Sequence, residues 1–173
     1  IAYLNGRLDQ IRAGTHLTLD RSGTKANLFA TLGPPDADGG IILSGHTDVV
    51  PVEGQDWSSD PFAARVEDGR LYGRGACDMK GFIACAMAFA PLYMEAGLKR
   101  PLHLAFSYDE EVGCLGAQVM LADLKALGRR PSICVVGEPT SMKIIEGHKG
   151  CCEYTTTFTG LEGHGSVPER GVN

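Results

Sequence analysis

The sequence has no long apolar run, no basic stripe and no cysteine pattern typical of a disulfide framework, and each absence excludes a class of protein. No apolar run reaches the roughly 20 residues that span a bilayer, and residues 81–93 are too short and wrongly flanked for a signal peptide. The net charge is −5, without the basic face of a nucleic-acid-binding protein. The six cysteines form no Cys-x-x-Cys and several lie in apolar runs, which favours buried, reduced thiols. We therefore expect a cytoplasmic protein whose partners include neither a membrane nor a nucleic acid.

There is also no internal repeat and no low-complexity segment, so the composition is that of an ordinary globular chain. Its 173 residues, 43% of them hydrophobic, suffice for one domain with a core and the start of a second. Apolar periodicity predicts helices over 1–13, 81–97 and 116–127, and strands over 16–19, 26–32, 41–45, 102–107 and 133–136. This alternation predicts a three-layer α/β domain. Residues 153–159 are polar and β-branched, as in an edge strand or the opening of another domain.

The chain starts within the first predicted helix and stops at Asn173 without a closing signal, so we interpret it as a fragment of a longer protein.

Three apolar, strand-like runs end at side chains that bind metals. The first ends at His46, the second at Asp109-Glu110-Glu111 and the third at Glu138. In open α/β sheets, ligands bind beyond the carboxyl ends of the strands. We therefore expect one imidazole and several carboxylates on one rim, with the acidic, glycine-rich turn around Asp78 beside them, and the combination predicts a metal site.

Each motif also has an ordinary interpretation when taken alone. His46 and Asp48 could be a surface pair, and Asp78 could cap the helix over 81–97. The acidic run could simply suit the dipole of the following helix, although three adjacent carboxylates repel one another and a divalent cation would offset that repulsion. Pro139 favours extended geometry at Glu138, which on its own is a weak signal.

Taken together, the motifs resemble those of a known family. They are Ser44-Gly45-His46-Thr47-Asp48, Gly73-Arg74-Gly75 with Asp78-Met79-Lys80-Gly81, Asp109-Glu110-Glu111-Val112-Gly113, and Gly137-Glu138-Pro139-Thr140. In this order they resemble the dinuclear-zinc amidohydrolases, which include acetylornithine deacetylases, succinyl-diaminopimelate desuccinylases, aminoacylases and bacterial glutamate carboxypeptidases. The likeness covers roughly residues 40–173, and the stretches 46–52, 55–57, 77–82 and 108–116 are most similar to the acetylornithine deacetylases.

The resemblance implies a metal centre with a pair of zinc ions, for which Co2+ can substitute. His46, Asp78 and Glu138 would hold one ion, and Asp78 would bridge to the second, which Glu111 also binds. The histidine that completes the second site is missing from this sequence, since neither His148 nor His164 matches it. We therefore expect this piece to bind one ion better than two and to have little or no activity alone.

The resemblance also implies catalytic roles. Glu110 would be the general base, a metal-bound hydroxide would attack the amide carbonyl, and Asp48 would orient the imidazole ligand. His164 would stabilise the oxyanion in the active site of a partner subunit, and a cis peptide bond is expected between Asp78 and Met79. His16 and His103 are interpreted as structural.

For the fold, the resemblance implies a zinc-peptidase-like α/β/α catalytic domain with a mixed, mostly parallel sheet. Its N-terminal part would occupy residues 1–148, and a smaller α+β lid and dimerisation domain would begin at 149–173. The expected reaction is hydrolysis of N-acetyl-L-ornithine to L-ornithine and acetate in arginine biosynthesis, by a homodimer of the full-length protein. The alternatives are a desuccinylase or another acyl-amino-acid or peptide hydrolase of the family, a non-catalytic metal-binding relative, and a globular domain with acidic strand ends.

Overall fold

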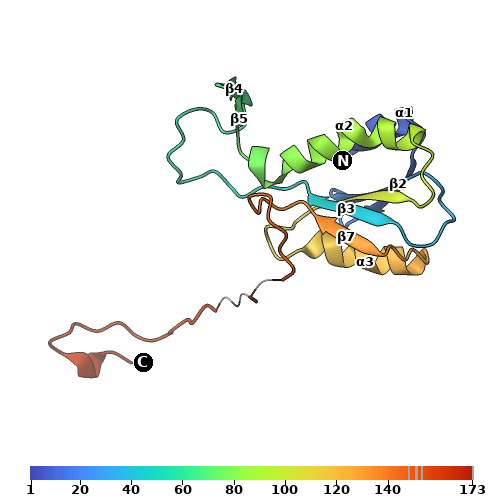
Figure 1. Cartoon of the computed structure of the whole chain (residues 1–173). Coiled ribbons are helices and arrows are strands. Elements are labelled where there is room, and N and C mark those ends of the chain that lie inside the picture. Colours follow the sequence, from blue (N-terminus) through green and yellow to red (C-terminus); the bar gives the residue numbers. More distant parts are fainter. Residues whose placement is uncertain (148, 151, 153, 173) are drawn as a thin grey trace. The chain divides into compact units, whose positions relative to one another are not determined.

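The structure, a computed structural model, describes residues 1–147, 149–150, 152 and 154–172 (Figure 1). The chain divides into two compact units, Ile1–Ser141 and Met142–Asn173, and each is described by itself. The predicted domain boundary after residue 148 stays a prediction, and His148 and Cys151 lie outside the described residues.

The first unit is built on a five-stranded mixed sheet with the order β1-β2-β6-β3-β7. Its strands are β1 (Gly14–Leu19), β2 (Ala26–Leu32), β3 (Ile41–His46), β6 (Leu102–Ser107) and β7 (Ile133–Val136). β2 pairs antiparallel with β1 and β6, whereas β3 pairs parallel with β6 and β7. The five strands predicted between residues 16 and 136 are all present, with ends shifted by at most two residues.

Helices cover both faces of this sheet, which confirms the three-layer arrangement. α1 (Ala2–Gln10) and α2 (Gly81–Glu95) lie on one face and α3 (Leu115–Ala126) on the other (Figure 1). Alternation along β2 explains the division: Leu28 packs in a core cluster with residues of α1 and α2, whereas Phe29 packs with Met120 of α3. Each fully buried side chain of this size stabilises the fold by about 1.5–3 kcal/mol relative to exposure.

The sheet brings the metal-binding side chains to one edge. Because β6, β3 and β7 are parallel, their carboxyl ends lie at the same edge, and the register sets His46 opposite Ser107. The acidic run begins two residues after β6 ends at Ser107, and Glu138 lies two residues after β7 ends at Val136. The prediction that three strand ends share a rim is therefore confirmed.

Several sequence expectations are wrong in detail. Within 51–75, where the periodicity predicted no strand, Arg65–Glu67 (β4) and Arg70–Tyr72 (β5) form a small antiparallel hairpin. Residues 154–159 are not a strand, and Glu153 lies outside the described residues. The described cysteines are free, as expected, but exposed: Cys77, Cys85, Cys114, Cys134 and Cys152. Cys134, for instance, lies on β7, the last strand in the order, whose side chains are all exposed.

Among the described residues, no helix is long and apolar enough to cross a membrane.

Candidate metal centre

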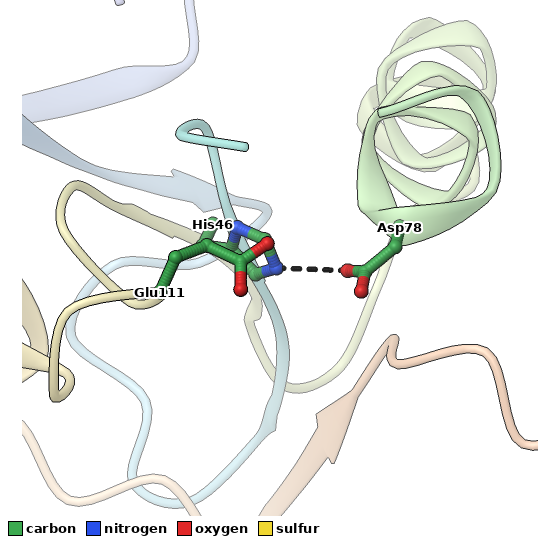
Figure 2. A group of neighbouring side chains, drawn as sticks. All are labelled: His46, Asp78 and Glu111. Carbon is green, nitrogen blue, oxygen red and sulfur yellow. Dashed lines mark hydrogen bonds and ion pairs between the residues drawn. The ribbon is translucent and has the colours of Figure 1, made fainter. Parts of the chain in front are cut away.

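His46 is the centre of the cluster because three carboxylates approach its Nε2. It ends β3 and is 2% exposed. Its Nε2 lies 3.0 Å from Asp78 Oδ1, a contact drawn as a dashed line in Figure 2, and 3.6 Å from Glu138 Oε1. A third carboxylate oxygen, Glu110 Oε2, lies 4.0 Å from the same nitrogen. One buried imidazole therefore faces carboxylates from three separate parts of the chain.

Asp78 lies in an irregular turn, Ala76–Lys80, immediately before α2. The Asp78–Met79 peptide bond is cis, as the resemblance predicted. The N-cap position of α2 is Lys80 and no side chain caps the helix there, so the alternative that Asp78 caps this helix is wrong. A Cβ at Gly81 would lie 2.5 Å from the Ala76 carbonyl oxygen, and Gly75 has a φ of +79°. The turn thus requires both glycines, which accounts for the glycine-rich approach to Asp78.

The three carboxylates of the acidic run after β6 make different contacts. Asp109 turns to Lys25, with 2.5 Å between Oδ2 and Nζ, and so forms an ion pair away from the cluster. Glu110 and Glu111 instead join the groups around His46. Of the three adjacent carboxylates, the two that the resemblance implicates are those the structure brings to the imidazole.

Asp48 contacts two parts of the cluster, the His46 imidazole and the Glu111 backbone. His46 Nδ1 lies 3.0 Å from the backbone carbonyl oxygen of Asp48 and 3.6 Å from its carboxylate Oδ1. The carboxylate Oδ2 accepts the backbone N–H of Glu111 at 3.0 Å. In this structure the imidazole is therefore oriented by the carbonyl, while the carboxylate positions the acidic loop.

These groups fit a divalent cation. Two sets of three residues each have their ligand atoms within 4.8 Å of one another. One set is His46, Asp78 and Glu111, and the other is His46, Glu110 and Glu138. Imidazole nitrogen and carboxylate oxygens are ligands that zinc accepts. The sets overlap at His46, so the distribution of ligands between a pair of ions stays a prediction.

The electrostatics of the cluster agree with this fit. Burial raises the pKa of Glu138, and the charges of Asp78 and Glu110 raise it further, although His46 opposes them. Burial lowers the pKa of His46, but its contacts with Asp78 and the Asp48 carbonyl, with the charge of Glu138, raise it overall. Converging carboxylates repel one another, and a bound cation would offset this repulsion.

Sequence reasoning missed the residues that support the cluster. Asn27, 1% exposed, accepts the Tyr108 N–H through Oδ1 at 3.3 Å and donates from Nδ2 to the Gly116 carbonyl at 2.8 Å. It thereby closes the base of the acidic loop. Met79 and Lys80 contact the backbone of His46 and Thr47. The only sequence signal for these two was their place directly after Asp78.

His164, the last predicted site residue, lies in the second unit, in a turn with Ser166. Its Nδ1 lies 2.8 Å from Ser166 Oγ and 3.2 Å from the Ser166 backbone nitrogen. Because the units are described separately, its catalytic role stays a prediction.

Comparison with known proteins matches residues 42–163 to the family described as Peptidase family M20/M25/M40. An acetylornithine deacetylase from Pasteurella multocida (strain Pm70) is 39% identical over 157 residues, which are 91% of this chain and 40% of that protein. An acetylornithine deacetylase from Proteus mirabilis (strain HI4320) is 41% identical over 149 residues, 86% of this chain and 37% of that protein. The chain thus spans about 40% of the length of these relatives.

Solved structures show the same fold. Human carnosine dipeptidase 1 matches with a TM-score of 0.65 and 22% identity, over 78% of this chain and 31% of that chain. The M20 family metallo-carboxypeptidase Sso-CP2 from Sulfolobus solfataricus matches with a TM-score of 0.64 and 21% identity, over 79% and 31%. At this identity the two matches establish the fold alone.

Proposed function

The chain belongs to peptidase family M20/M25/M40, and from this premise we propose that it carries the metal-binding part of a metal-dependent amidohydrolase acting on N-acetyl-L-ornithine. The substrate rests on the relatives that are 39% and 41% identical and named acetylornithine deacetylase. The observation that carries the metal-dependent chemistry is the convergence of three carboxylates on the buried His46.

His46, Asp78 and Glu138 would hold one zinc ion, and Asp78 and Glu111 would hold part of a second site, where Co2+ could replace Zn2+. Both sets contain only the nitrogen and oxygen donors that these metals accept. When bound, the cation supplies Lewis-acid polarisation of the amide carbonyl and lowers the pKa of the attacking water.

Glu110 would move the protons of the reaction. Its carboxylate lies beside the His46 ring, with 4.0 Å between Oε2 and Nε2, and so stands at the edge of the ligand set. It would take a proton from the water that attacks the acetyl carbonyl and then give it to the amide nitrogen as the C–N bond breaks. The products would be acetate and L-ornithine, as arginine biosynthesis requires. We place this reaction in the cytoplasm and in a homodimer of the full-length protein.

The test uses the full-length protein with Glu110→Gln, His46→Ala and, as a matched control, Glu95→Gln at the exposed end of α2. Glu110→Gln should lower kcat by about 10²–10⁴-fold and leave the zinc content unchanged, whereas His46→Ala should lower the zinc content. The Glu95→Gln variant should behave as wild type. Unchanged kcat in Glu110→Gln would contradict the mechanism.

The same preparation decides the substrate. Rates on N-acetyl-L-ornithine, N-succinyl-L,L-diaminopimelate and dipeptides should be compared as kcat/KM. A higher kcat/KM on either of the last two would replace the deacetylase by the alternative hydrolases, and absence of turnover on all three with zinc bound would favour a non-catalytic relative.

A further inference from the structure

The backbone N–H of His46 is bound by a sulfur atom instead of a strand carbonyl. It donates to Met79 Sδ, with 3.3 Å between nitrogen and sulfur, in a buried position. β7 ends at Val136, opposite Ser44, so β3 extends beyond its neighbour. A buried N–H without an acceptor destabilises the fold, and the thioether supplies that acceptor.

The backbone groups of successive residues in β3 point alternately to β7 and to β6. This alternation explains why the His46 N–H has no strand carbonyl as its acceptor. Gly137 N–H donates to the Ser44 carbonyl across the β3–β7 pair, and Thr47 N–H donates to the Ser107 carbonyl on the β6 side. Two residues after Ser44, the N–H of His46 points to the same side as β7, where β7 has already ended.

Close packing fixes the thioether at this place. Met79 is 0% exposed. A Cβ at Gly45 would lie 2.9 Å from Met79 Cε and 3.2 Å from Ile83 Cγ1. The side chain therefore lies directly against the backbone of β3, and a Cβ at position 45 would displace it.

From these contacts we propose that Met79 is a positioning residue of the metal centre, whose thioether fixes His46 relative to Asp78. The inference rests on the proposed metal centre. Met79 directly follows Asp78, so its bond to the His46 backbone joins two ligand-bearing segments that lie 32 residues apart. The next residue adds a second connection, since Lys80 Nζ donates to the Thr47 carbonyl at 2.7 Å.

A substitution can separate a positioning role of Met79 from its packing in the core. Leucine has a similar volume to methionine and no hydrogen-bond acceptor, so Met79→Leu retains the packing and removes the bond. In the metal-free protein the end of β3 can shift until its N–H reaches water. Metal binding requires the original position, so the loss should be seen in the dissociation constant for zinc.

The experiment measures zinc affinity in the full-length protein by competition with a chromophoric chelator, together with kcat and KM. Met79→Leu should raise the Kd for zinc about tenfold, the effect of one unpaired buried donor, and lower kcat with KM little changed. Met87→Leu is the matched control, because Met87 is partly buried on α2 and packs against the core cluster that contains Ile83. It should leave all three values unchanged.

Norleucine, which replaces the sulfur of methionine by a methylene, separates the acceptor from the packing. Incorporated into the wild type it should raise the Kd for zinc as Met79→Leu does, and in the Met79→Leu background it should add nothing. An unchanged Kd in Met79→Leu, or a rise that norleucine fails to reproduce, would overturn the proposal. His46→Ala then separates the two possible failures. If it also leaves zinc bound, the proposed metal centre is wrong. If it releases zinc, the metal centre stands and only the proposed role of Met79 is wrong.

Discussion

The carboxylate of Asp48 accepts the backbone N–H of Glu111, with 3.0 Å between Oδ2 and nitrogen. This bond joins the segment after β3 to the acidic loop after β6. The backbone carbonyl of the same residue lies 3.0 Å from His46 Nδ1. One residue therefore positions a proposed ligand from each of two strands, through two different groups.

Asp48→Ala should weaken zinc binding more than Asp48→Asn. Alanine keeps the backbone carbonyl but removes the acceptor of the Glu111 N–H, whereas the asparagine amide oxygen can still accept it. Residues that orient metal ligands typically change affinity by 10–100-fold, so we expect a rise in Kd in that range for alanine and less than about tenfold for asparagine. Competition titration of both variants measures the difference. Equal affinities would show that the carboxylate does not position the loop.

The sequence was sufficient to predict the strands and the sheet edge at which three of them end. Apolar runs end at His46 and Glu138, and a parallel sheet brings such ends together whatever the loops do. The pairing that makes β3 parallel to both neighbours cannot be read from the runs themselves, because periodicity reports burial and not strand direction.

The supporting contacts could not be predicted, because they join residues far apart in the chain. Nothing local to Asp109 indicates that it pairs with Lys25, whereas the next two carboxylates turn to His46. The sulfur of Met79 looks like any core methionine until the end of β7 leaves the His46 N–H without a strand carbonyl. The exposure of Cys134 could not be predicted for a similar reason, since it depends on β7 lying last in the sheet.

Stability should depend on pH through His103, a buried histidine on β6. It is 3% exposed, lies 3.1 Å from Thr31 Oγ1 through Nδ1, and stacks on Phe29. Burial, with a smaller contribution from the charge of Arg129, lowers the pKa of His103 below its ordinary value. The unfolded chain therefore takes up a proton near pH 6.5 before the folded protein does. This contribution to stability is present above pH 6.5 and is lost as the pH falls through the lower, folded pKa.

The measurement is the free energy of unfolding of wild type and His103→Gln between pH 7.5 and 5, with a chelator present so that metal binding does not contribute. The variant should show the shallower fall, and the slopes differ by at most about 1.4 kcal/mol per pH unit for one proton. Parallel slopes would mean that His103 takes up its proton equally in both states.

Glycine at position 137 is required by the helix packed against the end of β7. A Cβ there would lie 2.1 Å from Cγ of Phe82, a ring carbon on α2. Gly137→Ala should destabilise the protein by about 1–3 kcal/mol and weaken zinc binding, because Glu138 is the next residue. Gly6→Ala in α1 is the control, since its Cβ meets nothing within 4 Å, and alanine there should stabilise by about 0.5–1 kcal/mol. Denaturant titration measures both, and a Gly137→Ala variant as stable as wild type would contradict the contact.

His164 is expected to act on the reaction without holding metal. The Ser166 backbone N–H donates to Nδ1 at 3.2 Å, so the neutral ring carries its hydrogen on Nε2. An Nε2–H donor is what stabilisation of an oxyanion requires. His164→Gln in the full-length protein should lower kcat by about 10²–10³-fold and leave the Kd for zinc unchanged. The contribution from a partner subunit can be tested by mixing Glu110→Gln and His164→Gln subunits. If His164 serves the partner's site, each hybrid dimer contains one site with both residues intact, and activity returns on mixing. If it serves its own site, every site in the hybrid lacks one residue, and mixing restores nothing.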